Sequence, residues 1–308
     1  MKVIAKTNNL SREVWLKLRK QGIGGSDAGA ICGFNPWRSA IDVYVDKTSE
    51  KIEDIDNEAM RVGRDLEDYV AQRFMEATGK KVRRRNALLQ HDKHAWMLAD
   101  IDREIVGENA LLECKTANAY SSDKWADGKI PESYELQCHH YMAVTGAEKV
   151  YIACLIMGIE FVVREIERDE EVIANLISIE EDFWFNHVVE KRMPPPDGSD
   201  AAGNAIREMY TASRAETLDL SGLAGRMARY NDIEVLMGSL KAEQEMIKQE
   251  IMLAMGEADT ALCGNRKVTW KSQKGRVSID TKKLREELPD VYETYSKVGN
   301  PTRTFRIW

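Results

Sequence analysis

The sequence predicts a mixed α/β (α+β) fold, in which helices flank a central sheet and a C-terminal helical and α+β region follows. The first observation is the order of elements over residues 57–166: helix, strand, strand, strand, helix, strand. A three-strand meander, a crossover helix and a further strand build a mixed sheet with helices on both faces. The second observation is the Met-Pro-Pro-Pro-Asp-Gly run at residues 193–198, which predicts a domain boundary.

The composition is that of a soluble globular protein, and it narrows the possible partners. The chain has 308 residues, a formal net charge of -7 and no apolar run long enough to span a bilayer. It lacks the basic-then-apolar pattern of a signal peptide, so we expect a cytoplasmic protein with no membrane partner. The five scattered cysteines contain no C-x-x-C pair, which argues against disulfides, structural zinc or a four-cysteine iron–sulfur cluster. A DNA partner would require positive charge focused in a cleft or channel.

The front of the chain contains a glycine-rich segment with two possible roles. Residues 11–20 predict a short helix with Ser11 at its N-cap. The next run, GIGGSDAGAICGFNPW, surrounds Ser26 and Asp27 with small residues. A helix beginning near Ser26 would direct its positive end outward and expose backbone N–H groups suited to a phosphate. A tight turn that needs glycine for packing explains the composition equally well.

The strongest predicted helix of the front half covers residues 57–78 and ends at Gly79. Glu67 lies at the edge of its apolar stripe, so this carboxylate either has a buried stem at the surface or turns into a cleft. The stripe consists of Met60, Leu66, Val70, Phe74 and Ala77. The strand predicted at residues 81–90 then carries a basic cluster, Arg83, Arg84 and Arg85, which lines a phosphate track or lies on a solvated edge strand.

A predicted hairpin in the middle of the chain brings the strongest chemical candidates together. Gly107 begins a two-residue turn between two apolar-rich runs, which we predict to be strands at residues 95–105 and 110–116. Closing the hairpin there pairs Asp102 with Glu113 and Asp100 with Lys115. Directly paired positions have Cβ atoms about 4.5–5.5 Å apart, near enough for two carboxylates to share one divalent ion. A surface hairpin with solvated charges is the alternative for an isolated E-x-K triplet.

The remaining elements complete the predicted core and divide the chain. A helix at residues 131–144 carries Gln137, His139 and His140. Adjacent helical residues point in different directions, so we expect ordinary helix residues here and not a histidine metal site. Strands at residues 149–157 and 159–166 and a helix at 169–192 follow. The predicted domains are residues 1–193, a linker at 194–200, and a region of unassigned role at 201–308, containing a long helix at 223–255, short strands at 261–270 and 304–308, and a small helix at 281–288.

This order of elements, with D…E-x-K across the hairpin, resembles the PD-(D/E)XK restriction-endonuclease-like nuclease core. Several motifs are similar to those of the YqaJ-like viral recombinase family, relatives of phage lambda exonuclease. They are the glycine-rich segment, GRDLE (Gly63–Glu67), LADIDRE (Leu98–Glu104), LLECKTA (Leu111–Ala117) and YELQCHHYMAVTG (Tyr134–Gly146). The family's metal aspartate usually lies between proline and glycine, whereas Asp102 lies between Ile101 and Arg103. The hairpin register nevertheless favours Asp102, with Asp100 as the alternative.

The resemblance implies a metal-dependent site that cleaves phosphodiesters. Asp102, Glu113 and the Cys114 backbone carbonyl are expected to bind one Mg²⁺ or Mn²⁺ ion, and Glu67 a second ion or its waters. Lys115 is expected to orient or deprotonate the attacking water, with its pKa lowered by the metal. Gln137 would position Lys115 or a metal-bound water. The predicted DNA-binding residues, led by Arg19 and Ser26 at the 5′ phosphate, are Arg19, Ser26, Asp27, Arg83, Arg84 and Arg85.

The activity implied by the resemblance is a 5′→3′ exonuclease that digests linear double-stranded DNA and leaves 3′ single-stranded overhangs for phage-type recombination. Relatives assemble as rings, so we expect a homo-oligomer, a trimer or tetramer, that works beside a single-strand annealing protein. A structure-specific or restriction-like endonuclease of the same fold is one alternative, against which the glycine-rich segment argues. A non-catalytic DNA-binding or phage scaffold protein is the other, against which the full set of catalytic residue types argues.

Overall fold

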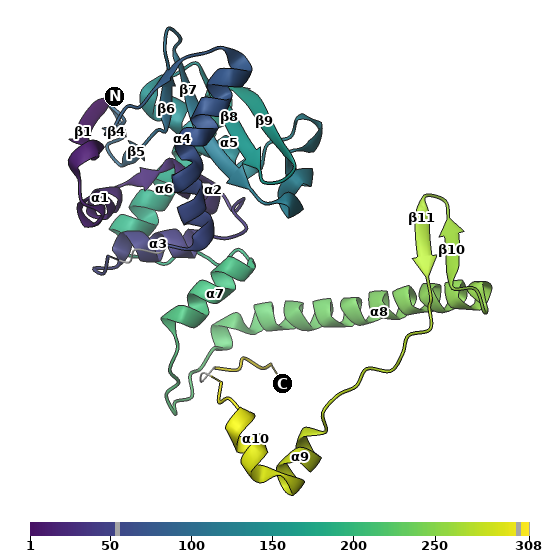
Figure 1. Cartoon of the computed structure of the whole chain (residues 1–308). Coiled ribbons are helices and arrows are strands. Elements are labelled where there is room, and N and C mark those ends of the chain that lie inside the picture. Colours follow the sequence, from purple (N-terminus) through teal and green to yellow (C-terminus); the bar gives the residue numbers. More distant parts are fainter. Residues whose placement is uncertain (53–55, 300–302, 308) are drawn as a thin grey trace. The chain divides into compact units, whose positions relative to one another are not determined.

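The computed structural model describes residues 1–52, 56–299 and 303–307, which form two compact units, Met1–Thr211 and Ala212–Trp308 (Figure 1). Two sheets and seven α-helices make up the described part of the first unit. Its strands are β1 (Lys2–Lys6), β2 (Ile23–Gly24), β3 (Val82–Arg83), β4 (Ala87–Gln90), β5 (Met97–Ala99), β6 (Arg103–Ile105), β7 (Ala110–Ala117), β8 (Lys149–Ile156) and β9 (Glu160–Glu167). Its helices are α1 (Arg12–Arg19), α2 (Gly25–Ile31), α3 (Ala40–Thr48), α4 (Glu58–Thr78), α5 (Glu132–Thr145), α6 (Glu170–Asp182) and α7 (Asp200–Met209).

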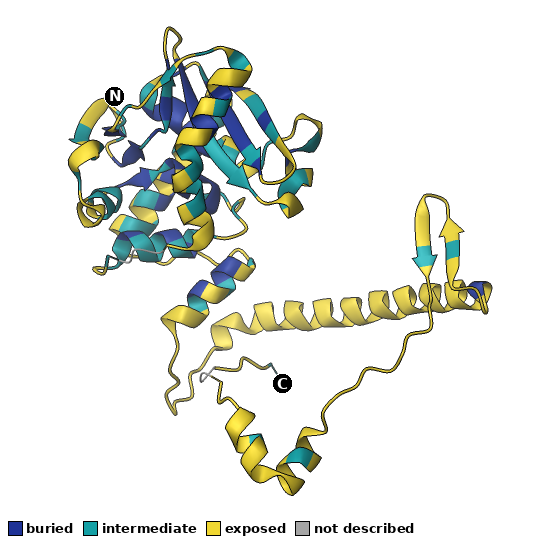
Figure 2. Cartoon of the chain, viewed as in Figure 1, coloured by how far each residue is buried: buried dark blue, intermediate teal, exposed yellow. Residues whose placement is uncertain are grey.

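The larger sheet has the strand order β3-β6-β7-β8-β9 and is mixed, as predicted. Strands β7 and β8 run parallel and are connected through α5, whereas the other neighbouring strands are antiparallel. Helix α4 covers one face, where Phe74 packs with Leu112 and Tyr151. Helices α5 and α6 cover the other face, and their side chains join the main core. The burial pattern in Figure 2 follows this layering, with the sheet strands buried between exposed outer helix faces.

The three-strand meander is divided between two sheets, which corrects the prediction of long continuous strands. The predicted strand at 81–90 breaks into β3 and β4 around Asn86, whose φ of 48° is left-handed. The predicted strand at 95–105 breaks into β5 and β6 across residues 100–102. The second half of the first strand, β4, and the first half of the second, β5, join a four-stranded sheet of order β1-β4-β5-β2, whereas β3 and β6 belong to the larger sheet. Asp100 and Asp102 therefore lie in a loop between two sheets and not within one strand.

Local sequence signals account for the position of α4. The Asn57 side chain accepts a hydrogen bond from the Met60 backbone N–H at the N-terminus, and Gly79 adopts φ 71° at the C-cap. Only part of the predicted stripe is buried, because the helix extends beyond the sheet at both ends: Met60 and Ala77 are exposed, whereas Val70 and Phe74 are buried.

The boundary between the units lies later than predicted. Helix α7 belongs to the first unit because Ala202 and Ala205 pack against Ile41 of α3. The second unit contains the long helix α8 (Ala224–Met255), the hairpin β10 (Thr260–Cys263) and β11 (Arg266–Thr269), and the helices α9 (Thr281–Glu287) and α10 (Pro289–Tyr295). Residues 304–307 are not in a strand, contrary to prediction, and residue 308 lies outside the described residues. Within the described ranges, no helix has the length and apolarity that a membrane span requires.

Candidate active site

The predicted hairpin register is confirmed. Arg103 pairs with Leu112 and Glu104 with Leu111, the register that places Asp102 opposite Glu113. Glu113 and Lys115 project from the face of β7 that α5 covers, because side chains alternate along a strand and Leu111 of the same set belongs to the core on that side. The strand thus directs both catalytic candidates toward α5.

Glu113, Lys115 and Gln137 form one hydrogen-bonded cluster between β7 and α5. The Lys115 Nζ lies 2.5 Å from Glu113 Oε1 and 3.0 Å from Gln137 Oε1. Gln137 Nε2 donates to Glu113 Oε1 at 2.7 Å and to the Tyr141 hydroxyl at 3.0 Å. The Lys115 ammonium also lies 4.6 Å from the centroid of the Tyr134 ring. Each polar atom of the Gln137 amide is therefore engaged, which fixes the orientation of both catalytic candidates.

Asp102 lies at the edge of the same strand. Strand β6 begins at Arg103, so it leaves the edge of β7 open beyond Leu112. The Asp102 carboxylate occupies this edge and accepts a hydrogen bond of 2.7 Å from the Cys114 backbone N–H. Because the N–H and C=O of one strand residue point to the same edge, the Cys114 carbonyl also faces Asp102. The predicted Asp102, Glu113 and Cys114 donors are thus brought together by the fold.

Glu67 reaches the same region from α4, where Arg103 holds it. The Arg103 guanidinium lies 2.5 Å from Glu67 Oε1 and 2.6 Å from the Asp102 backbone carbonyl. It also contacts Asp68 at 2.5 Å, and the side chain is buried. Arg103 was missed at the level of sequence, although its position opposite Leu112 places it on the α4 face of the sheet. This arginine connects two of the predicted metal ligands.

The ionisable groups of the site strongly influence one another. The pKa of Asp102 is raised well above its usual value, first by desolvation and then by the negative charges of Glu113 and Glu67. Burial lowers the pKa of Lys115, but the Glu113 and Asp102 carboxylates outweigh this effect, so its pKa is raised overall. The structure therefore favours the protonated ammonium. The expected lowering of the Lys115 pKa depends on a bound cation that neutralises those carboxylates.

The donor set suits a hard divalent cation. Carboxylates and a backbone carbonyl are the ligands that Mg²⁺ and Mn²⁺ prefer. Burial raises the pKa of Asp102 first, and repulsion by the Glu113 and Glu67 carboxylates, which a cation would relieve, raises it further. Among the described residues, however, no three His, Cys, Asp or Glu side chains lie close enough together to coordinate one metal ion. The reason is local, since Glu67 is turned toward Arg103 and Glu113 toward Lys115 and Gln137. Metal binding would require these side chains to exchange partners.

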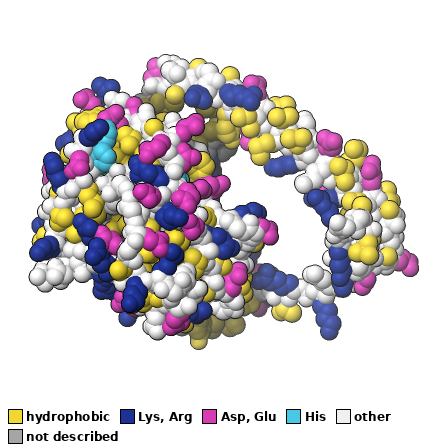
Figure 3. Space-filling model, turned by 90° about the horizontal axis from the view of Figure 1, so that it is seen from above, with side chains coloured by type: hydrophobic (Ala, Val, Ile, Leu, Met, Phe, Trp, Pro, Cys, Tyr) yellow, Lys and Arg dark blue, Asp and Glu magenta, His cyan; other side chains and the backbone are white. Residues whose placement is uncertain are grey.

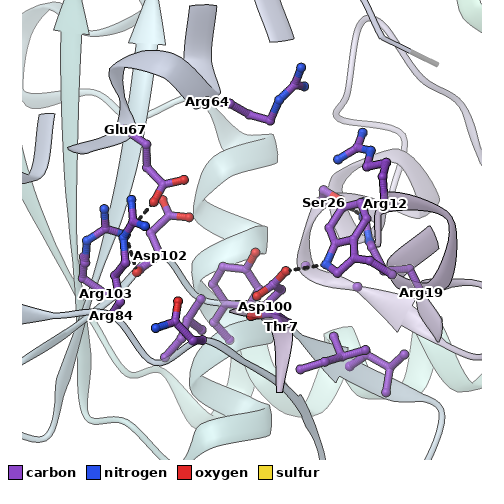
Figure 4. Close-up of a pocket in the computed structure, with 18 residues that line it drawn as sticks. Thr7, Arg12, Arg19, Ser26, Arg64, Glu67, Arg84, Asp100, Asp102 and Arg103 are labelled. Carbon is purple, nitrogen blue, oxygen red and sulfur yellow. Dashed lines mark hydrogen bonds and ion pairs between the residues drawn. The ribbon is translucent and has the colours of Figure 1, made fainter. Parts of the chain in front are cut away.

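A cleft of about 370 Å³ connects this site to the glycine-rich segment. Figure 4 shows Glu67 and Asp102 on one side of the cleft, and Arg19 and Ser26 facing them from the other. The Arg19 Nη2 donates to Ser26 Oγ at 2.8 Å, which brings the two predicted phosphate contacts together. The arginines that line the cleft are Arg12, Arg19, Arg64, Arg84 and Arg103. Three of them, Arg12, Arg64 and Arg103, were not predicted, because only the tertiary structure brings α1, α4 and the hairpin to one cleft.

The predicted basic cluster is divided by the strand geometry. Arg84 lines the cleft, and its guanidinium lies 2.5 Å from Asp68. Arg83 and Arg85 instead pair with Glu104 and line a smaller cavity elsewhere. The three residues therefore do not line one cavity, and only Arg84 lines the cleft beside the candidate active site.

Asp27 has a structural role, which corrects its prediction as a phosphate contact. Its side chain is fully buried and pairs with Arg38 and with Lys47 Nζ, the latter at 2.8 Å. Burial opposes ionisation of Asp27, but the neighbouring cations outweigh it and hold its pKa far below the usual range. A buried carboxylate with two cationic partners is not available to a phosphate.

The glycines of the same segment serve close packing. A Cβ at Gly25 would lie 2.5 Å from the Tyr141 ring, and one at Gly29 would lie 2.8 Å from the Ser133 side chain. Both contacts are between α2 and α5, so these glycines allow the two helices to approach closely. The packing explanation therefore holds for Gly25 and Gly29, while Ser26 remains at the cleft.

The structure also shows which contacts Asp100 and His140 make. Asp100 lies outside the larger sheet and accepts a 2.8 Å hydrogen bond from Trp15 Nε1, so its predicted pairing with Lys115 is wrong. His140 is fully buried between the Glu180 carboxylate, 2.8 Å from Nδ1, and the Leu98 carbonyl, 2.9 Å from Nε2. This hydrogen-bonded contact joins α5 to α6, so His140 has a structural role in packing the two helices.

The fold and the site together define a protein of the PD-(D/E)XK nuclease-like class. A family model, the YqaJ-like viral recombinase domain, matches residues 14–148. The chain is 40% identical over 300 residues to the YqaJ protein of Bacillus subtilis (strain 168), covering 96% of this chain and 94% of that protein. This chain therefore belongs to the YqaJ-like viral recombinase family.

Solved structures with the same fold include an alkaline exonuclease, LHK-Exo, from Laribacter hongkongensis. One structure of it has a TM-score of 0.50 at 21% identity, and the structure in complex with dAMP has a TM-score of 0.51 at 24% identity. Each similarity covers 58% of this chain and 93% of that chain. The resemblance to an exonuclease fold, expected from the motifs, is confirmed.

Proposed function

We propose that this protein is a metal-dependent 5′→3′ exonuclease that digests linear double-stranded DNA and leaves 3′ single-stranded overhangs for phage-type recombination. The observation that carries the proposal is one cleft that contains the Asp102 end of the hairpin site on one side and Arg19 with Ser26 on the other. Carboxylates that can hold a cation thus face donors that can hold a phosphate, as cleavage near a DNA end requires.

In this proposal, the carboxylates bind cations and Lys115 acts on the attacking water. Asp102, Glu113 and the Cys114 carbonyl would hold one Mg²⁺ or Mn²⁺ ion, and Glu67 would hold a second ion or its waters. The cations supply charge neutralisation at the phosphate and lower the pKa of bound water. Glu113 is the carboxylate that most raises the pKa of Lys115, and with Glu113 engaged by a cation the burial of Lys115 would favour the neutral amine. Lys115 can accordingly orient the attacking water or accept its proton, with Gln137 fixing its position.

Arg19 and Ser26 are proposed to hold the 5′ phosphate of the DNA end. The Arg19 guanidinium lies over the Trp15 ring at 4.7 Å and donates to Ser26, so its approach to the cleft is fixed on two sides. A guanidinium and a hydroxyl can bind phosphate oxygens together. Arg84 and Arg64 add positive charge along the same cleft, which meets the need for focused charge on an acidic chain.

The expected partners belong to the same proposal. The substrate is the end of a DNA duplex, and a ring of three or four copies would retain DNA between cleavage steps. The overhang produced by such an enzyme is a substrate for a single-strand annealing protein, which we propose as the functional partner.

Duplex DNA of defined ends provides the test. We expect Mg²⁺-dependent release of nucleotides from the 5′ end of a 5′-phosphorylated linear duplex labelled separately at each end, and no cleavage of covalently closed circles. Glu113→Gln and Lys115→Ala should abolish release while binding to DNA ends persists. Glu165→Gln, at an exposed position of strand β9, is the matched control and should retain activity. Cleavage of closed circles with intact linear ends would favour the endonuclease, and no cleavage with either metal would favour a non-catalytic DNA-binding protein.

A further inference from the structure

The second unit has almost no core of its own. Among its described residues, 212–299 and 303–307, only Met255 is buried. Helix α8 is 32 residues long, and all of its other residues are exposed, as Figure 2 shows. Figure 3 shows apolar side chains at the surface of this part of the chain. Ordering a helix costs conformational entropy, and the burial of apolar side chains normally offsets this cost. The exposed apolar surface of α8 therefore requires a partner that buries it.

The apolar residues of α8 repeat with the spacing of a coiled-coil seam. From Tyr230 to Ala254, the intervals alternate between three and four residues over eight consecutive positions, which is the a and d pattern of a heptad repeat. Seven of the eight residues are apolar. The positions are Tyr230, Ile233, Met237, Leu240, Gln244, Ile247, Ile251 and Ala254. The larger members are exposed, for example Leu240 at 55% and Ile247 at 48%.

The charges that flank the seam complement a second copy of the same helix. In a parallel, in-register pair, each g position contacts the e position five residues later on the partner. These contacts join Arg229 to Glu234 and Glu243 to Lys248 across the interface. The other two contacts, Leu236 with Lys241 and Glu250 with Met255, place no like charges together. The flanking sequence therefore contains no repulsive pair in this arrangement.

Gln244 distinguishes the parallel arrangement from an antiparallel one. In a parallel pair, Gln244 lies opposite its own copy, so the two amides can hydrogen-bond across the seam. In an antiparallel pair with Met237 opposite Leu240, Gln244 lies opposite Ile233, and its amide is buried without a partner. A single polar residue at an a position sets the register and orientation of many coiled coils.

We propose that α8 is a self-association helix, which forms a parallel, in-register coiled coil with a second copy of this chain. The inference does not depend on the nuclease activity. Other exposed apolar residues of α8 lie outside the seam, both in the middle of the helix, for example Val235, and in its last two turns, for example Leu253.

Cysteine cross-linking in the full-length chain tests the arrangement. In a Cys263→Ser background, which removes the exposed native thiol, Gln244→Cys places a thiol in the seam, and Ala242→Cys places one at the opposite f position. Under mild oxidation, Gln244→Cys should form a covalent dimer about tenfold faster or more, because only seam positions face their own copies. Equal rates at the two positions, or no dimer at either, would overturn the proposal. The Gln244→Cys and Ile233→Cys chains can also be mixed. A cross-link between these two variants, without one between two Gln244→Cys chains, would indicate an antiparallel pair and overturn the proposal.

A second pair of variants separates the seam from general hydrophobicity. Leu240→Glu with Ile247→Glu should suppress the Gln244→Cys cross-link, because each change introduces charge into the seam. Val235→Glu with Leu253→Glu, on exposed positions outside the seam, is the matched control and should retain the cross-link. Thermal unfolding of the first unit, expected to be unchanged in both, shows that the variants are folded. An equal loss of cross-linking in both pairs would refute the assignment of the seam.

Discussion

Gln137 provides the most informative perturbation of the candidate site, because it touches both catalytic candidates without being a predicted metal ligand. Gln137→Leu retains the approximate volume and removes the hydrogen bonds to Glu113, Lys115 and Tyr141. The substitution leaves the buried Tyr141 hydroxyl without its partner. A buried group that loses its hydrogen bond lowers the free energy of unfolding by about 1–3 kcal/mol.

The activity of this variant should fall further than its stability suggests. Residues that orient metal ligands typically contribute about 10–100-fold to metal affinity or activity, and we expect a decrease of this size in kcat for linear duplex DNA. The KM for DNA should change little, because Gln137 lies on the Lys115 side of the site and does not line the cleft.

The assay is a titration of initial rate against Mg²⁺ and DNA concentration, with thermal unfolding measured on the same samples. Gln72→Leu, on the exposed face of α4, is the matched control and should leave both quantities unchanged. Wild-type kcat in Gln137→Leu at every Mg²⁺ concentration would refute the positioning role. A large rise in KM with unchanged kcat would instead assign Gln137 to DNA binding.

Three further predictions concern the cleft, the hydrophobic core and the buried Asp27 ion pair. Arg84→Ala should raise the KM for linear DNA and reduce the salt dependence of DNA binding by about one ion. Arg83→Ala should do neither, because only Arg84 lines the cleft. Equal effects of the two substitutions in filter-binding titrations would contradict this prediction. Phe74→Ala should lower the free energy of unfolding by about 3–5 kcal/mol, and the half-exposed neighbour Met75→Ala by less than about 1 kcal/mol, both measured by urea denaturation. Asp27→Asn removes one side of a buried ion pair and should lower the free energy of unfolding by about 3–5 kcal/mol. Because the folded-state pKa of Asp27 is depressed, its contribution is fully present above the ordinary value of 3.8 and is lost as the pH falls below it. Wild-type and Asp27→Asn stabilities should therefore converge in acid, and a constant difference down to low pH would show that the ion pair is not the cause.

Local rules predicted the elements that carry the chemistry. The turn at Gly107 set the pairing of the two strands, and alternation along β7 placed Glu113 and Lys115 on one face. The N-cap at Ser11 located the first turn of α1, and the C-cap at Gly79 located the last turn of α4. These features depend on residues near in sequence, so hydrophobic period, turn chemistry and capping were enough to find them.

Contacts between residues far apart in the sequence could not be predicted from these local rules. Nothing near Asp27 in the sequence indicates that Arg38 and Lys47 enclose it, and nothing in the run of three arginines indicates that Arg84 alone reaches the cleft. The break between β5 and β6 also escaped prediction, because a change of sheet depends on what each half-strand can pair with. Such outcomes depend on which elements pack together, and packing involves the whole chain.

The sequence by itself determined the order of elements, the hairpin register and the set of donors at Asp102, Glu113, Lys115 and Gln137. Only the tertiary structure decided that Arg103 bridges Glu67 to the Asp102 backbone and that Arg19 and Ser26 face these carboxylates across one cleft. The physical reason is the range of the interactions. Backbone hydrogen bonding and side-chain alternation act over a few residues, whereas the charges around a cleft come from α1, α4 and the hairpin, which only the packed core brings together.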